Sequence, residues 1–291
     1  MKNTHKLYTD VIAKSGSKNE PLEVTENGTY EAPEGSGYSP VKVSVKLEGN
    51  PLQDVIDNQG GDGKPSCYYL FYNYKGSSLE SALKGLDTSN VKNFKFMFNS
   101  CSNLISISQL DTSSATDFGS MFQDCRSLTT IPQLDASSVT SMSGMFYYCY
   151  NLNSIPQLDT SNVIYMNDMF YGCERLTTIP QLDTSSVTNM NDMFYNCISL
   201  TTIPQLDASS VTKMNDMFYN CRSLTTIGMY GFTRSIDISK TALEHDALVA
   251  FLNQAGTAYN SSQRITMGSA KLALLSDEEK AIATNKGWTL A

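Results

Sequence analysis

Apolar residues recur along the middle of the chain in a 24-residue unit that is written six times, beginning at Leu86, Leu110, Leu134, Leu158, Leu182 and Leu206. In the fourth copy the apolar positions are Leu158, Val163, Met166, Met169, Phe170, Cys173, Leu176 and Ile179. A fixed period of about 20 to 50 residues is typical of a solenoid, in which each coil closes its apolar ends against its neighbours. The hydrophobic pattern therefore predicts an elongated repeat domain over residues 86–229.

Each coil is predicted to contain a helix and a strand. From Val163 to Cys173 the apolar residues lie three or four positions apart, which predicts a short amphipathic helix. The stretch Leu176–Ile179 is short and β-branched, as is typical of a strand. Proline cannot donate a ladder hydrogen bond, so we expect the stacked parallel sheet to end at the proline after the buried isoleucine. That position holds Pro132, Pro156, Pro180 and Pro204.

Three motifs of the unit resemble the BspA-like bacterial leucine-rich repeats. In the fourth copy they stand as Leu158–Val163, as Met169–Cys173, and as Cys173, Leu176 and Ile179. The resemblance covers about half of the chain, from Leu86 to roughly Gly228. It implies an α/β leucine-rich-repeat solenoid of six coils with caps, but it implies little about activity, because such families are defined by architecture.

The overall charge argues against some partners. The chain has 29 acidic and 21 basic residues and a net charge of −8, whereas nucleic-acid binding needs a basic face. No stretch approaches the length of a membrane span. The first residues contain no apolar core of a secretory signal. We therefore expect a protein made in a bacterial cytoplasm, with no nucleic-acid partner and no membrane insertion.

Six of the seven cysteines occupy one position of the repeat, on its apolar side. Free cysteine at such a position behaves as a small hydrophobe. Disulfides are disfavoured because parallel side chains in successive coils seldom adopt the dihedral angle that a disulfide requires. A reducing cytosol also keeps thiols reduced. We predict a structural row of buried thiols: Cys101, Cys125, Cys149, Cys173, Cys197 and Cys221.

The region before the repeats is divided into three segments. Residues 1–48 are predicted to form an arm, up to about residue 20, followed by a small β-module with Asn27-Gly28 as a hairpin turn. Val24–Val43 resembles a small module of phage virion and prophage proteins, which implies an attachment or spacer element rather than an active site. Residues 49–66 have the composition of a flexible linker. The aromatic-rich residues 67–85 are predicted to cap the solenoid; a ligand platform is the alternative.

Residues 230–291 are predicted to form a C-terminal capping region. Strands are expected at Ser235–Ser239 and Arg264–Met267. Capping-box patterns at Thr241–Glu244 and Ser276–Glu279 predict two helix starts. The tail from Ala281 to Ala291 resembles the terminal cap of BspA-like proteins carried by phages, and we expect Trp288 to seal the last coil.

Catalytic and metal-binding patterns are sparse in this sequence. The only histidines, His5 and His245, are far apart, and no nucleophile elbow or phosphate loop is present. We predict no catalytic residue, no metal site and no cofactor. Bound calcium could compensate the repulsion between aspartates stacked in a row. We favour the alternative, in which each aspartate caps backbone amides of its own turn. The row is Asp87, Asp111, Asp135, Asp159, Asp183 and Asp207.

Two repeated surfaces are candidates for binding. Tyrosine supplies binding area at little entropic cost, although these tyrosines could simply pack along the convex side. The first surface comprises Tyr147, Tyr171, Tyr195 and Tyr219 with the neighbouring Asp168, Asp192 and Asp216. The second is the exposed strand side, with Thr130, Thr178 and Thr202.

These observations predict a non-enzymatic phage structural protein, a head or tail fibre or a decoration protein. Its N-terminal module would join other virion proteins, and its repeats would bind a bacterial-surface or mucosal glycan or protein. We expect a homo-oligomer located in the virion. A bacterial cell-surface leucine-rich-repeat adhesin is the alternative, and it would need an export route that the sequence does not show.

Overall fold

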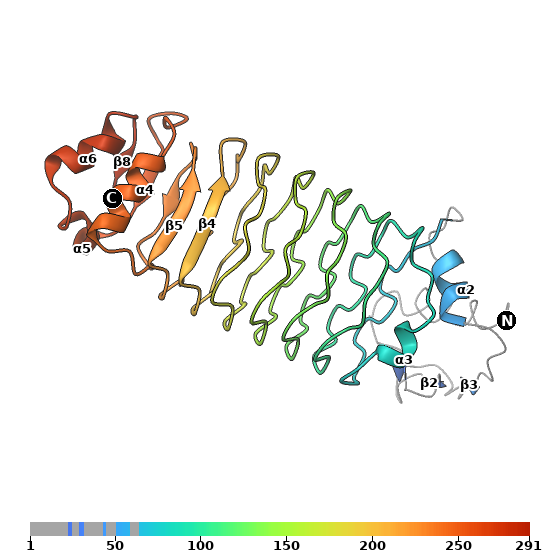
Figure 1. Cartoon of the computed structure of the whole chain (residues 1–291). Helices are drawn as coiled ribbons and strands as arrows, with labels where there is room; N and C mark the ends of the chain where they lie inside the picture. The colour runs from blue at the N-terminus through green and yellow to red at the C-terminus, as the bar shows by residue number, and fades with distance from the viewer. Residues whose placement is uncertain (1–22, 25–28, 32–42, 45–50, 59–63) are drawn as a thin grey trace.

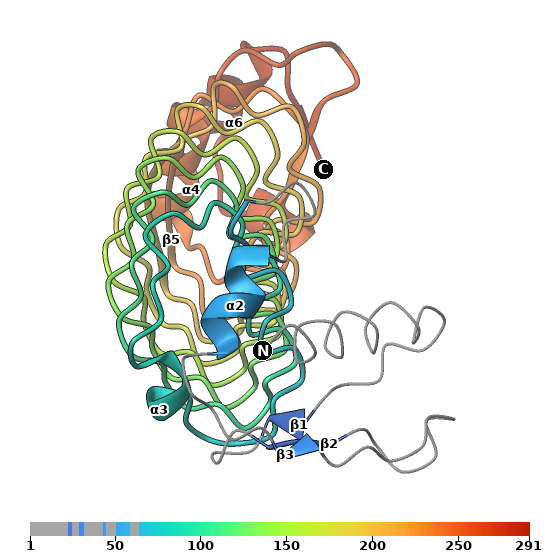
Figure 2. The same cartoon turned by 90° about the vertical axis from the view of Figure 1, so that its right-hand side faces the viewer.

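The computed structural model describes residues 23–24, 29–31, 43–44, 51–58 and 64–291. The repeats stack as successive coils into an elongated, curved body, with helix α2 near one end and helices α4 to α6 at the other (Figure 1). Seen from the N-terminal end, the coils lie behind one another around a common interior (Figure 2). The 24-residue spacing of the contacts between coils fits a leucine-rich-repeat solenoid.

The predicted helix from Val163 to Cys173 is wrong. One residue in four on this side of the coil has a left-handed backbone, such as Asp168 with φ 59° and Gly172 with φ 71°. Left-handed residues interrupt the i→i−4 pattern of an α-helix. The chain instead makes consecutive tight turns, in which the Met169 amide donates to the Met166 carbonyl and the Cys173 amide to the Phe170 carbonyl. Tight turns share the three- and four-residue spacing on which the helix prediction rested.

The alternate amides of these turns donate to the next coil. Asp168 donates to the Asn191 carbonyl at 2.9 Å, Phe170 to Met193 at 2.9 Å and Gly172 to Tyr195 at 2.7 Å. Gly172 is required here, because a Cβ at this position would lie 2.5 Å from the Tyr148 ring. This side of the solenoid is therefore held by hydrogen bonds between coils rather than within them.

The strand side forms a regular pair only at the last repeats. Strands β4 (Thr202–Asp207) and β5 (Thr226–Tyr230) are parallel, whereas the preceding coil contributes a single bridge, Thr178 to Thr202. Gly228 stands in β5 where the four preceding coils have proline. It restores an amide donor, and a Cβ there would lie 2.9 Å from the Pro204 carbonyl carbon.

The expectation that the sheet ends at proline fails at Pro204, which lies inside β4 beside a register shift. A proline keeps its carbonyl as a hydrogen-bond acceptor, and Gly228 in the neighbouring strand β5 lets the two backbones approach each other.

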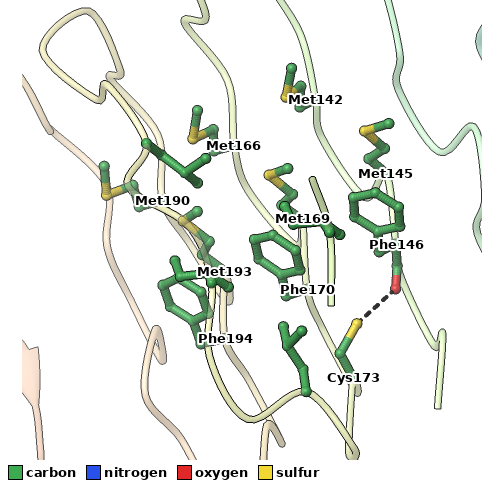
Figure 3. Close-up of a cluster of buried hydrophobic side chains, with 14 of the residues drawn as sticks. Met142, Met145, Phe146, Met166, Met169, Phe170, Cys173, Met190, Met193 and Phe194 are labelled. Carbon is green, nitrogen blue, oxygen red and sulfur yellow. Dashed lines mark hydrogen bonds between the residues drawn. The ribbon is translucent and has the colours of Figure 1, made fainter. Parts of the chain in front are cut away.

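The interior is built from stacked rows of identical side chains. One phenylalanine per coil stacks on the next with ring centroids 5.3–5.9 Å apart and nearly parallel rings. Methionines pack beside them (Figure 3). The cysteines of the repeats are buried and free. Each donates its thiol to a phenylalanine carbonyl of the coil before, as Cys173 does to Phe146 at 3.2 Å. Burial raises the pKa of the Cys173 thiol, which keeps it protonated and able to donate.

Polar side chains at the coil corners also bridge neighbouring coils. The buried hydroxyl of Thr160 donates to the Asp183 carbonyl at 2.8 Å. On the adjoining edge, the Gln133 side-chain amide donates to the Gln157 carbonyl at 2.6 Å, and Gln157 donates to Gln181 at 2.5 Å. These bonds add to the backbone bonds that hold consecutive coils together.

The N-terminal part differs from the predicted linker. Strands β1 (Glu23–Val24), β2 (Thr29–Glu31) and β3 (Val43–Ser44) form an antiparallel sheet in the order β1-β2-β3. The predicted arm over residues 1–20 and the turn at Asn27-Gly28 lie outside the described residues. Within the predicted linker, residues 51–58 form helix α2 (Pro51–Asn58). Composition suggested flexibility, but the buried side chains of Leu52, Val55 and Ile56 give this segment an apolar face to pack.

The segment 67–85 is not only a cap. The Phe71 ring stacks on Phe98 at 5.6 Å, and the Phe71 amide donates to the Met97 carbonyl, so this segment forms a coil in register with the repeats. Helix α3 (Glu80–Leu83) follows it. The preceding helix α2 supplies the cover: the Gln53 side chain exchanges two hydrogen bonds with the Asp87 backbone.

The C-terminal region continues the winding with regular elements. Strands β6 (Ile236–Asp237), β7 (Arg264–Thr266) and β8 (Thr289–Leu290) form a parallel sheet in that order. Between them lie helices α4 (His245–Gln254), α5 (Ser269–Leu272) and α6 (Asp277–Thr284).

One of the two predicted capping boxes exists. Ser276 and Glu279 cap α6 reciprocally, as predicted. Thr241 does not cap α4, because its buried hydroxyl donates to the Ile238 carbonyl, and α4 begins four residues later at His245. Trp288 is buried, contacts Phe232, and donates its indole N–H to the Gly256 carbonyl at 2.8 Å.

Candidate functional site

The tyrosine row consists of Tyr147, Tyr171, Tyr195 and Tyr219, which the turns of four successive coils bring into one stack. Ring centroids are 4.6, 4.4 and 4.5 Å apart along the row, and the planes of neighbouring rings differ by 21°, 2° and 15°. The spacing follows from the backbone bonds that fix one coil on the next. The row is partly exposed, and Tyr219 at its end is 45% exposed.

The stacking decides which part of each ring a ligand can reach. Ring faces in the middle of the row are covered by the neighbouring tyrosines, so the accessible parts are ring edges and hydroxyl groups. A sugar could not stack on these covered faces as it would on an isolated aromatic platform. The row therefore offers a line of hydrogen-bonding phenols at the coil spacing of about 4.7–4.9 Å expected for paired strands.

The carboxylate row, Asp168, Asp192 and Asp216, lies next to the tyrosine row. Each aspartate has a left-handed backbone, with φ from 51° to 59°, a conformation that Asp tolerates better than most residues. Burial raises the pKa of Asp192, and repulsion from Asp168 and Asp216 raises it further. The three carboxylates thus interact electrostatically, and together with the tyrosines they form a polar strip that carries negative charge.

The Tyr147 and Tyr171 phenols of the strip remain protonated at neutral pH. Burial, and then the neighbouring Tyr148, raise the pKa of Tyr147 to about 12. Burial is also the main cause of the raised pKa of Tyr171. At neutral pH the strip therefore presents both donors and acceptors.

The threonine side is exposed but separate from the strip. Thr130, Thr178 and Thr202 are exposed, and Thr202 lies in β4. The neighbouring Thr201 already makes a hydrogen bond between coils, because its hydroxyl donates to the Thr177 carbonyl of the preceding coil at 3.1 Å. The sequence-predicted residues thus form two surfaces on different stretches of the coil.

The repeated aspartates at the start of each unit act locally. Asp159 accepts the Ser161 amide at 3.1 Å and the Ser161 hydroxyl at 2.7 Å through the same oxygen. The same arrangement recurs from Asp87 to Asp183, as the capping interpretation predicted. A groove of about 640 Å³ runs along this edge, lined in part by Asp111, Asp135 and Asp159. The repeat pattern alone could not indicate a hollow there.

The described residues contain neither a cluster of metal-ligating side chains nor a membrane-spanning helix. In residues 51–58 and 64–291 and the three short strands, no three His, Cys, Asp or Glu side chains converge on a point where a metal ion would fit. No described helix has the length and apolarity needed to cross a bilayer.

The sequence patterns missed aromatic contacts outside the strict period. Tyr148 packs edge-on against Tyr147 and Tyr171, and Arg126 lies over the Tyr150 ring. At the other end of the repeats, Tyr69 stacks on Phe96 at 4.7 Å. In the sequence, only the cluster Tyr147-Tyr148-Cys149-Tyr150 indicated such contacts. It occurs in one copy of the repeat, so it does not stand out in the 24-residue period.

These geometries define a leucine-rich-repeat type of solenoid with ordered rows of side chains on its surface. The chain belongs to the family described as "Mycoplasma protein of unknown function, DUF285", whose model matches residues 65–178 and 151–244. Together the two matches span more than half of the chain, including all six sequence repeats.

A search of solved structures returned the crystal structure of the T. pallidum leucine-rich repeat protein TpLRR. The sequence identity is 16% and the TM-score 0.38, with 79% of this chain and 92% of that chain covered. No curated protein matched the chain.

Proposed function

We propose that this protein is a non-enzymatic adhesion protein, which uses its repeats as a rigid surface to bind a bacterial-surface or mucosal glycan or protein. The observation that carries the proposal is the polar strip of stacked tyrosines and adjacent carboxylates. Its rings are held in place by the coil spacing, so little side-chain entropy is lost when they contact a ligand.

The strip favours an extended ligand with repeating polar groups. Phenol groups and carboxylates recur once per coil, so a linear polymer lying along the solenoid would meet equivalent groups in successive coils. Several weak contacts on one chain add through effective concentration rather than through a single deep pocket. A glycan chain or an extended polypeptide suits this arrangement.

Binding to immobilised mucin glycans and to intact bacterial cells tests the strip. The triple variant Asp168→Asn, Asp192→Asn and Asp216→Asn keeps the side-chain shape and removes the charges, and we expect affinity to fall about tenfold, which corresponds to roughly 1.4 kcal/mol. The matched control is Thr130→Val, Thr178→Val and Thr202→Val on the strand side. If only this control lost binding, the threonine side would be the ligand surface.

The non-enzymatic part of the proposal has its own test. Purified protein is incubated with surface polysaccharides, and the release of new reducing ends is measured. We expect no release, whereas hydrolysis of any of these polymers would overturn this part of the proposal.

The place of display is a finer proposal. Assignment to a virion rests on the phage-like sequences at Val24–Val43 and Ala281–Ala291, and the family match to the repeats does not bear on it. The alternative, a bacterial cell-surface adhesin, rests on the repeats alone. Immunogold labelling with an antibody against residues 86–226 distinguishes them: label on phage capsid or tail supports the virion, and label on the cell envelope supports the adhesin.

A further inference from the structure

The tyrosine row places reactive phenols of successive coils face to face. Tyr171 and Tyr195 have centroids 4.4 Å apart and planes that differ by only 2°, and Tyr195 and Tyr219 are nearly as close, at 4.5 Å and 15°. In a parallel stack at this distance, the carbon beside the hydroxyl-bearing carbon of one ring lies near its counterpart in the next. Those ortho carbons are the positions at which two tyrosyl radicals couple.

Among the described residues, the remaining aromatic groups lack this combination of partly exposed phenols and close, parallel stacking. Tyr148 stacks on Tyr150, but their centroids are 5.4 Å apart and their planes differ by 29°. The buried phenylalanine row has similar stacking, such as Phe170 on Phe194 at 5.6 Å, but has no phenol and no solvent access. Tyr165, Tyr230 and Tyr259 are exposed, yet in the described part of the chain no second tyrosine ring stacks on them. Partial exposure and parallel stacking of phenols coincide in the tyrosine row.

We propose that the tyrosine row is an oxidative crosslinking site, at which hydrogen peroxide and a haem peroxidase join tyrosines of adjacent coils as dityrosine. The proposal does not depend on the adhesive function, because it needs no ligand.

The reaction balances with one peroxide for each crosslink. The peroxidase removes one hydrogen atom from each of two phenol groups, and peroxide is reduced to two molecules of water. The two radicals form one carbon–carbon bond between their ortho carbons. Each of these carbons then loses a proton, and each phenoxyl oxygen regains one, so the product carries two intact hydroxyl groups and has lost two hydrogens in total.

The surrounding structure directs oxidation to these rings. The repeat cysteines, which would compete for oxidant, are buried, and burial raises the pKa of thiols such as Cys173. The coils beside the row are already fixed by backbone hydrogen bonds, so the rings of one chain meet each other before they meet another molecule. The product is a covalent tie between coils that are otherwise held only by non-covalent contacts.

Peptide mapping of the full chain after peroxidase treatment tests the proposal. Trypsin separates the tyrosines of the row into residues 127–175, 176–213 and 214–222, since cleavage follows Arg175, Lys213 and Arg222. We expect dityrosine fluorescence, monomeric protein on a denaturing gel, and mass-identified pairs joining 127–175 to 176–213 and 176–213 to 214–222. Each pair should be lighter than the sum of its peptides by two hydrogens, and the treated protein should have a higher Tm.

A pair of matched double variants makes the test specific. Tyr171→Phe with Tyr219→Phe leaves no two neighbouring tyrosines within the row, while the phenylalanine row shows that such rings stack at this spacing. We expect both crosslinked pairs to disappear in this variant and to persist in Tyr165→Phe with Tyr230→Phe. The same pairs in the first variant, covalent dimers in place of intrachain links, or oxidation without dityrosine would each overturn the proposal.

Discussion

The repeats and the C-terminal region bury similar apolar side chains, but they differ in where their backbone hydrogen-bond partners lie. In the repeats, the Phe170 amide donates to Met193 in the next coil, and the Cys173 thiol donates to Phe146 in the previous one. In the C-terminal region, helix α6 carries a capping box made by its own Ser276 and Glu279. Order in the repeats therefore comes from contacts about one coil apart in sequence, whereas order in the C-terminal region is partly local.

This difference predicts two kinds of response to mutation. A coil that loses its neighbour loses backbone bonds on one side, so damage in the middle of the stack should spread through the repeats. Damage to a surface contact of the C-terminal helices should stay near them. Trp288 is the only tryptophan and lies in the C-terminal region, so its fluorescence reports that region separately.

The largest expected effect is that of Phe170→Asp. Phe170 is fully buried and stacks on Phe146 and Phe194. An unpaired buried charge costs several kcal/mol, so the variant should unfold the repeats in one cooperative step at a much lower temperature. Calorimetry measures this, with the exposed Thr178→Asp as a control that should keep the wild-type Tm. An unchanged Tm for Phe170→Asp would contradict the packing of the coils.

A smaller effect is expected for Thr160→Val. This isosteric change removes the hydroxyl that donates to the Asp183 carbonyl at 2.8 Å, in a site that is 1% exposed. Losing this part-buried hydrogen bond costs about 0.5–1.5 kcal/mol. Urea unfolding gives the free energy, and the exposed Thr178→Val should change it by less than about 0.5 kcal/mol. Equal stability of both variants would show that the corner bonds do not hold the coils.

Acid should weaken the repeats through their capping aspartates. Hydrogen bonds from Ser161 and Ser185 lower the pKa of Asp159 and Asp183 below the ordinary value of an aspartate. A pKa that is lower in the folded state gives stability that is present above the unfolded value and lost as pH falls through the folded one. We expect Tm to drop below about pH 4. Asp159→Asn with Asp183→Asn should reduce that drop, because Asn accepts the same bonds without titrating; an identical pH profile would argue against this cause.

The smallest effect is expected in the C-terminal region, at His245. Its imidazole lies 2.8 Å from Asp246 and 3.0 Å from Glu279, and these carboxylates raise its pKa above the ordinary value of a histidine. A raised pKa gives stability that is complete below the unfolded value and lost as pH rises through the folded one. Trp288 fluorescence should therefore report a slightly lower unfolding midpoint above pH 7 than at pH 6. In His245→Gln this difference should vanish, and a change in the repeats instead would contradict the local character of this contact.

The apolar period predicted the buried positions of the repeat and the stacking of coils. Met169, Phe170 and Cys173 are fully buried, as their spacing indicated. Spacing alone could not distinguish a helix from consecutive tight turns, because both bring every third or fourth side chain inward. The left-handed residues Asp168 and Gly172 were the sequence signal that separates the two, since both types tolerate that conformation.

The candidate surfaces were predictable only as rows of residue types. The repeat placed Tyr171 and Tyr195 in adjacent coils, but the sequence could not show that their rings stack and cover each other's faces. The linker prediction failed because it relied on the polar composition of the segment. It overlooked the apolar face of helix α2, on which Val55 and Ile56 are buried. Contacts between distant segments, such as Gln53 with the Asp87 backbone, have no signal in a single sequence.

The most direct test of the backbone arrangement is a measurement of scalar couplings across hydrogen bonds by NMR on isotope-labelled full-length protein. The structure predicts a coupling from the amide nitrogen of Phe170 to the carbonyl carbon of Met193, one coil away. A coupling from Phe170 to the carbonyl carbon of Met166 would instead show an α-helix on this side of the repeat. That result would contradict the inter-coil bonding on which the tyrosine row and the polar strip depend.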